Sequence, residues 1–215
     1  MVAIIYVTIY TLEAFCTISA SYMLFRFPFR EFIWKKLILS VLLAVFSYSL
    51  RDITVINKFT IIVPMAYLFS YTLFIRYISK IRILWASVMM TTGYALVGAT
   101  QMIVLIVFDV IGITMAEVQT NLSYLVLAQI LSSAFVFLFS FLYYYRGAGF
   151  TYEFPRWRWK HLWLVFLELI LLAVLFRFII LNDLSQILAN IVMLVALLML
   201  SRKMERDELR NELEP

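Results

Sequence analysis

The Lys and Arg residues of this chain are concentrated in alternate gaps between long apolar runs. Seven such runs cover residues 2–25, 34–50, 53–75, 83–108, 122–145, 162–181 and 184–200. Most of them are close to the roughly 20 residues that a helix needs to cross about 30 Å of hydrocarbon. Fifteen of the eighteen basic residues follow the first, third, fifth or seventh run: Arg26, Arg30, Lys35, Lys36, Arg76, Lys80, Arg82, Arg146, Arg156, Arg158, Lys160, Arg202, Lys203, Arg206 and Arg210.

This alternation predicts an orientation, because the cytoplasmic loops of membrane proteins carry an excess of Lys and Arg. The other gaps hold Arg51 and Lys58 with Asp52, then only Asp109 and Glu117, then only Asp183 as charged residues. Basic residues after both the first and the last run require an odd number of spans. We therefore predict an all-α, polytopic integral membrane bundle of seven transmembrane helices, with the N-terminus outside and the C-terminus in the cytoplasm.

The composition agrees with a membrane protein. Hydrophobic residues make up 65% of the chain, whereas a soluble domain is nearer half apolar. No linker divides the sequence, so we expect one transmembrane domain, residues 1–200, and a charged helical tail, residues 201–215. The net charge of +5 favours anionic lipid over nucleic acid as a partner, because the cations border apolar runs. The expected location is the plasma membrane of a bacterium.

The cytoplasmic segments suggest two ways of meeting other molecules. The loop over residues 143–161 interleaves aromatic rings with cations, which is typical of the headgroup layer; the alternative is a docking site for a cytoplasmic partner. The tail is rich in helix formers, and the segment from Arg202 to Leu213 is the expected contact for a cytoplasmic or membrane signalling partner. Its broken apolar stripe fits either a homodimer coil or a solvated stub.

The second run is short, which places Trp34, Lys35 and Lys36 at the inner interface. Long basic side chains near the end of a transmembrane helix usually extend toward the headgroups. We therefore expect both lysines to reach out of the bundle to the interface.

Residues for catalysis are missing from the sequence. One His and one Cys without a carboxylate cluster provide no zinc site, and five Gly form neither a Walker nor a Rossmann pattern. We expect no enzyme activity, no metal and no cofactor.

Three ionisable residues lie inside apolar runs: Glu13 near the middle of the first, and Glu168 and Arg177 in the sixth. Such residues are costly in hydrocarbon and usually face protein or water, so each is a candidate site residue. Nine residues separate Glu168 from Arg177, which turns a helix by roughly 180° and prevents them from pairing. We expect Glu13 to pair with Arg177; the alternative is that Arg177 extends to the outer headgroups and Glu13 is neutral.

Three amides, Gln101, Gln129 and Asn190, also lie at membrane depth. Their ordinary use is hydrogen bonding between helices. The alternative is that Gln101 and Gln129, each about seven residues from the outer surface, join Glu13 and Arg177 around a cavity that opens to the outside and accepts a small or peptide ligand. Thr91, Gly93, Ala95, Gly98 and Ala99 form a run of small residues in the fourth span, which favours close helix packing.

In its architecture the chain resembles the membrane sensor domain of peptide-sensing histidine kinases of the accessory-gene-regulator type. The likeness consists of the length, six or seven spans with short outer loops, Leu-, Ile-, Val- and aromatic-rich helices, and a charged helix from Ser201 to Leu213 after the last span. It implies a quorum-sensing role in which the outer part of the bundle binds a cyclic peptide. The kinase region of that family is absent from this sequence, so the resemblance implies a separate signalling partner.

We therefore expect a non-catalytic sensor or regulatory subunit, whose ligand shifts the population of bundle arrangements and moves the seventh helix. The alternative is a small-molecule transporter or the substrate-binding subunit of a transporter complex, similar to the vitamin-binding subunits of energy-coupling-factor transporters. Those subunits typically have six spans, which disagrees with the charge pattern. A structural subunit of a larger complex is the third class.

Overall fold

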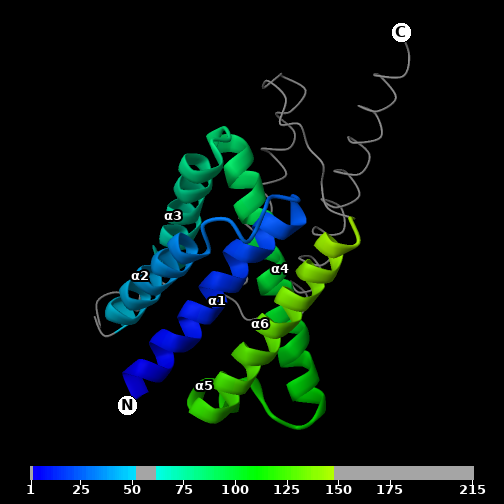
Figure 1. Cartoon of the computed structure of the whole chain (residues 1–215). Coiled ribbons are helices and arrows are strands. Elements are labelled where there is room, and N and C mark those ends of the chain that lie inside the picture. Colours follow the sequence, from blue (N-terminus) through cyan, green and yellow to red (C-terminus); the bar gives the residue numbers. More distant parts are fainter. Residues whose placement is uncertain (1, 52–61, 148–215) are drawn as a thin grey trace.

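The described helices are rods whose ends alternate between two sides of the molecule (Figure 1). This computed structural model describes residues 2–51 and 62–147. The elements are α1 (Val2–Leu24), α2 (Ile33–Arg51), α3 (Ile62–Ser79), α4 (Ile83–Val110), α5 (Met115–Thr120) and α6 (Leu122–Tyr145). All regular structure within these residues is helical, so the all-α prediction is confirmed for this part of the chain.

Three of these helices are long and apolar enough to cross a membrane: Ala3–Leu24, Ile83–Val110 and Leu122–Tyr145. They correspond to the first, fourth and fifth runs expected from the sequence. The shorter α2 and α3, with 19 and 18 residues, fall on the second and third runs. The expected spans 162–181 and 184–200 and the tail 201–215 lie outside the described residues.

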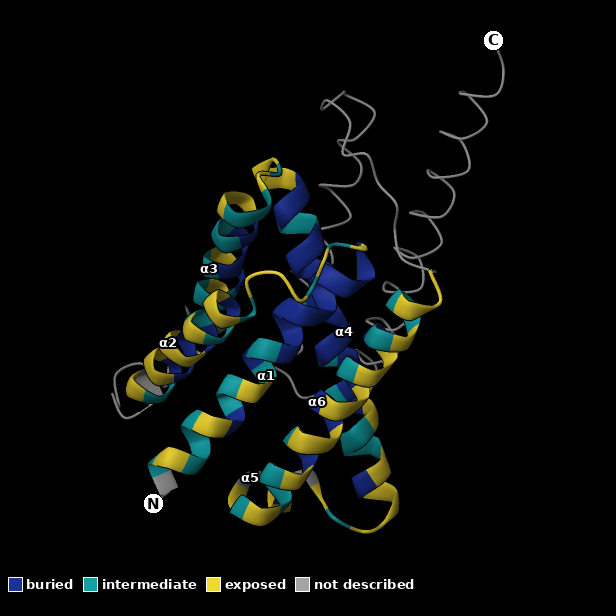
Figure 2. Ribbon diagram, viewed as in Figure 1, coloured by how far each residue is buried: buried dark blue, intermediate teal, exposed yellow. Residues whose placement is uncertain are grey.

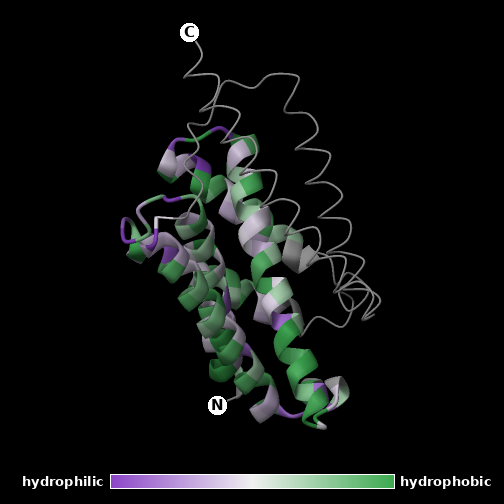
Figure 3. Ribbon diagram, turned by 90° about the vertical axis from the view of Figure 1, so that its right-hand side faces the viewer, coloured by the Kyte–Doolittle hydropathy of each residue, from purple (hydrophilic) through white to green (hydrophobic). Residues whose placement is uncertain are grey.

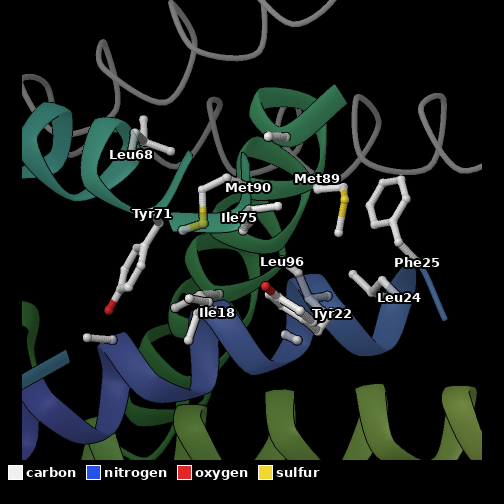
Figure 4. Close-up of a cluster of buried hydrophobic side chains, with 14 of the residues drawn as sticks. Ile18, Tyr22, Leu24, Phe25, Leu68, Tyr71, Ile75, Met89, Met90 and Leu96 are labelled. Carbon is white, nitrogen blue, oxygen red and sulfur yellow. The ribbon is translucent and has the colours of Figure 1, made fainter. Parts of the chain in front are cut away.

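Helix α1 is the central element of the described bundle. It packs against α2, α4 and α6, while α3 packs mainly against α4. Residues 16–25, from the second half of α1 to the residue after its end, are all buried. This is expected for a helical segment that is enclosed on every side. Around them lies a core that includes Ile18, Tyr22, Tyr71, Met89 and Met90 (Figure 4).

Helices α1 and α4 approach closely at Gly93 of α4. A Cβ atom added to Gly93 would clash with Ser21 Oγ and lie 3.1 Å from the Thr17 carbonyl oxygen of α1. Because a side chain at position 93 would clash there, glycine lets the α4 backbone pack directly against the Ser21 side chain of α1. The small-residue run of α4 thus serves close packing at Gly93, as the sequence indicates.

On α6, large apolar side chains lie on the outside of the bundle, and mostly small ones line the face that packs within it. In α6 the buried face consists of Ala128, Ser132, Ser133, Val136 and Ser140. Phe135, Leu138 and Leu142, by contrast, are 56%, 59% and 53% exposed. Figure 2 shows this exposed outer surface, and Figure 3 shows that much of it is hydrophobic while the purple, hydrophilic stretches gather at the helix ends. This distribution suits a lipid solvent, which is as apolar as the side chains that meet it.

Two helix ends are closed by Schellman motifs. At the end of α1, Arg26 has φ 55°, and its N–H donates to the Met23 carbonyl while the Phe27 N–H donates to the Tyr22 carbonyl. At the end of α4, Gly112 and Ile113 donate to the carbonyls of Asp109 and Phe108 in the same way. Both motifs reverse the chain within a few residues, which keeps the connections short.

The connection between α4 and α6 contains a helix that the sequence prediction missed. Helix α5 begins with a capping box, in which the Thr114 side chain accepts from the Glu117 N–H and the Glu117 side chain accepts from the Thr114 N–H. Val118 of α5 packs with Phe108 and Ala128 in a small second core. The segment 109–121, expected as a loop, therefore forms a structured cap on the ends of α4 and α6.

Candidate functional site

Three of the polar residues singled out in the sequence lie together inside the bundle. Gln101 Nε2 of α4 donates a hydrogen bond of 2.7 Å to Glu13 Oε1 of α1. The same nitrogen donates a weaker bond of 3.5 Å to Gln129 Oε1 of α6. We call Glu13, Gln101 and Gln129 the polar triad. It joins the three helices that are long and apolar enough to cross a membrane.

The triad lies at one depth because the helix ends are aligned. Glu13 is eleven residues from the start of α1, Gln101 nine from the end of α4, and Gln129 seven from the start of α6. At 1.5 Å per residue these positions are roughly 10–16 Å from the corresponding helix ends. All three side chains are half-buried, so the triad sits inside the apolar layer without being sealed in the core.

Tyrosines of α3 and α4 belong to the neighbouring core. Tyr71 of α3 is fully buried and Tyr94 of α4 packs against the same core, and Tyr67 packs edge-on against Tyr71 at 6.0 Å between ring centroids. The Tyr71 hydroxyl is 3.2 Å from the Ser40 hydroxyl of α2. A polar contact between α2 and α3 therefore lies within this core.

Two polar groups of the triad take no part in these hydrogen bonds. The Gln101 amide nitrogen uses both of its hydrogens, one toward Glu13 and one toward Gln129. Gln101 Oε1 remains as an acceptor and Gln129 Nε2 as a donor, and neither has a hydrogen-bond partner among residues 2–51 and 62–147. A polar ligand that offers one donor and one acceptor would match these two groups.

The other residues predicted for the site are not described. Arg177, the expected partner of Glu13, lies outside residues 2–51 and 62–147, as do Glu168 and Asn190. The expected pairing of Glu13 with Arg177 therefore stays a prediction. In the described part of the chain no group of three His, Cys, Asp or Glu residues gathers to hold a metal ion.

Lys36 forms a second polar centre, and the prediction that its side chain reaches out of the bundle is wrong. The Lys36 side chain is fully buried; its Nζ donates to the Phe29 carbonyl at 2.6 Å and lies 3.8 Å from the centroid of the Tyr22 ring. Only Lys35 is exposed as expected, 4.8 Å from the Phe32 ring centroid. Lys36 turns inward because the α1–α2 loop presents a carbonyl and a ring face to it, and both are good cation partners.

The Lys36 contacts tie three helices together at the end of the bundle opposite the N-terminus. Tyr22 of α1, under the ammonium group, also shares a hydrogen bond of 2.9 Å with Ser79 of α3. Ser40, one turn after Lys36 in α2, donates to the Lys36 carbonyl at 2.8 Å and contacts Tyr71. The sequence alone gave no signal for this arrangement, since a lysine at a helix end is ordinarily exposed.

Comparison of the chain with protein-family models, with curated proteins and with solved structures finds no match. The function therefore has to be argued from the geometry.

Proposed function

We propose that this chain is a seven-helix integral membrane protein with its N-terminus outside. The three apolar helices of transmembrane length support the membrane location. Seven exposed cations lie where α1, α3 and α6 end and α2 and α4 begin: Arg26, Arg30, Lys35, Arg76, Lys80, Arg82 and Arg146. The connection between α4 and α6, at the other side, carries Asp109 and Glu117 and no cation. By the positive-inside rule the first side faces the cytoplasm.

Within the membrane the chain acts as a non-catalytic sensor or regulatory subunit. The observation that carries this proposal is the polar triad, in which Glu13, Gln101 and Gln129 converge from three helices. An intramembrane carboxylate bound by an amide is costly to keep and is therefore a ligand-site candidate by default. A small or peptide ligand that binds between α1, α4 and α6 would change their mutual packing.

The response would reach the cytoplasm by a shift between two arrangements of the bundle. Helix α1 carries Glu13 of the triad and, about two and a half turns later, Tyr22, whose ring contacts Lys36. A movement of α1 at the triad therefore reaches the inner loop directly. We further propose that the tail from Arg202 to Leu213 carries the signal to a separate partner.

A pull-down from native membranes tests this function, with the full-length chain, a chain lacking residues 201–215, and Gln101→Leu. We expect a regulatory protein to be retained by the full-length chain, lost on tail deletion and reduced with Gln101→Leu. Ile103→Leu, on the exposed side of α4, is the matched control. An ATP-hydrolysing module retained by all variants would instead indicate a transporter subunit and contradict the sensor proposal.

A further inference from the structure

Besides Lys35, the cytoplasmic rim of the described bundle carries two groups of three cations. Arg26 and Arg30 of the α1–α2 loop and Arg146 at the end of α6 form the first, which we call the loop–α6 group. Arg76, Lys80 and Arg82 around the α3–α4 turn form the second. All six side chains are exposed. The two groups have equal charge, so simple attraction to an anionic membrane would treat them alike.

The loop–α6 group is organised by aromatic contacts between the α1–α2 loop and α6. Phe29 is half-buried and packs edge-on against Phe141 at 6.2 Å and Tyr144 at 5.8 Å, both in α6. These contacts press the α1–α2 loop onto the last turns of α6. The Phe29 carbonyl is held at the same time by the buried Lys36 ammonium. The loop is therefore fixed from two sides, by α6 and by α2.

The position of the α1–α2 loop determines where the guanidinium groups of Arg26 and Arg30 lie. Arg30 Cζ lies 5.9 Å from the centroid of the Phe29 ring. Arg26 Nη2 lies 3.8 Å from the position of a Cβ on Gly147, next to Arg146. Arg26 and Arg30 thus converge on the end of α6 from one loop. By contrast, none of Arg76, Lys80 and Arg82 lies over an aromatic ring within the described part of the chain.

We propose that Arg26, Arg30 and Arg146 form a binding site for the phosphate headgroup of an anionic phospholipid in the cytoplasmic leaflet. Guanidinium groups are planar forks that match phosphate oxygens, and three of them around one rim form charge-assisted hydrogen bonds that single charges do not. The acyl chains would lie along the exposed face of α6, where Leu138 and Leu142 point outward and Tyr145 is 81% exposed at the expected headgroup level. This site is independent of the polar triad and of the proposed sensor function.

The test uses full-length protein in nanodiscs of phosphatidylcholine with a minor share of phosphatidylglycerol. After exchange into mild detergent, native mass spectrometry measures the phosphatidylglycerol that stays bound. We expect wild type and the triple variant R76Q/K80Q/R82Q to retain it, and R26Q/R30Q/R146Q to retain at least about tenfold less, since losing even one charge-assisted hydrogen bond is worth a factor of this size. Arg30→Lys, which keeps the charge but loses the fork, should give a smaller loss.

Three results would overturn the proposal. Equal losses in both triple variants would indicate unspecific charge attraction, and equal retention would indicate no site. Inorganic phosphate that displaces the lipid at millimolar concentration would identify a soluble anion as the ligand instead. The unfolding transition of each variant in nanodiscs of phosphatidylcholine alone shows whether the variant is folded. If R26Q/R30Q/R146Q does not fold, the single variants Arg30→Lys and Arg82→Lys are compared instead. We then expect a loss of bound phosphatidylglycerol only for Arg30→Lys.

Discussion

Gln101 of α4 donates a hydrogen bond of 2.7 Å to the carboxyl group of Glu13 in α1. This bond joins two helices near the middle of their lengths, and its strength depends on the charge of Glu13. A neutral interhelical hydrogen bond in a membrane is worth about 0.6 kcal/mol on average, whereas one to a charged group is worth roughly 1.5–3 kcal/mol.

The Glu13–Gln101 bond is tested by a double-mutant cycle with Glu13→Leu and Gln101→Leu. We expect a coupling free energy of about 1.5 kcal/mol or more, because the carboxylate form accepts the bond. Unfolding in mixed micelles of SDS and mild detergent gives the free energies, with Ile103→Leu as the control. A coupling near 0.6 kcal/mol would show that Glu13 and Gln101 act only as a neutral packing contact.

The crossing of α1 and α4 predicts a second effect. Gly93→Ala places a methyl group against Ser21 Oγ, so we expect a loss of about 1–3 kcal/mol in unfolding free energy from overpacking. Adding Ser21→Ala removes the clashing oxygen and should recover part of this loss. The prediction fails if Gly93→Ala is neutral, or if the second substitution makes the protein less stable still.

The sequence singled out Glu13, Gln101 and Gln129 because a polar residue in an apolar run needs a polar neighbour, but it favoured Arg177 as the partner of Glu13. Glu13, Gln101 and Gln129 lie at similar distances from their helix ends, and alternating topology brings such positions to one depth. The core positions of Tyr67, Tyr71 and Tyr94 were not predicted, since these three occur among 13 tyrosines and the sequence does not say which face of a helix each occupies.

Lys36 and α5 were missed for different reasons. The sequence places Lys36 one residue from the exposed Lys35 and contains nothing that distinguishes the two. Lys36 is buried and Lys35 is exposed because the α1–α2 loop folds back and brings the Phe29 carbonyl to Lys36 alone. This is a tertiary effect. Helix α5 is only six residues long, too short for an apolar periodicity; its one signal is the Thr114 to Glu117 spacing of a capping box.

The Lys36 contact predicts how firmly the α1–α2 loop is held. Lys36→Met keeps the length of the side chain but removes the ammonium group that binds the Phe29 carbonyl. Losing a charge-assisted hydrogen bond should raise the open population of the loop about tenfold. Limited trypsin digestion at Arg26 and Arg30 measures this, because cleavage requires an open backbone.

Lys35→Met is the matched control for the loop experiment. Lys35 is the exposed neighbour and has no bond to the loop carbonyl, so its cleavage rate should equal that of wild type. Equal acceleration in Lys35→Met and Lys36→Met would mean that the loss of net charge, and not the buried contact, controls the loop.

The orientation is testable with single cysteines in a Cys16→Ser background, which removes the one native cysteine. In intact cells a membrane-impermeant maleimide should label Glu117→Cys in α5 and leave Lys80→Cys in the α3–α4 turn unlabelled. Permeabilised cells should show labelling of both. Labelling of Lys80→Cys alone in intact cells would reverse the proposed topology.

The most direct measurement of the central proposal is whether water reaches the polar triad from outside. In the Cys16→Ser background, a small charged methanethiosulfonate reagent is added to intact cells that carry Gln129→Cys or Leu131→Cys. Gln129 is half-buried at the triad and Leu131 is 45% exposed on the outer surface of α6, where lipid would surround it. A ligand site that opens to the outside predicts fast reaction at Gln129→Cys and none at Leu131→Cys, because the reagent needs an ionised thiol in water. No reaction at Gln129→Cys would mean that the triad is sealed and only packs the helices, which would contradict the account.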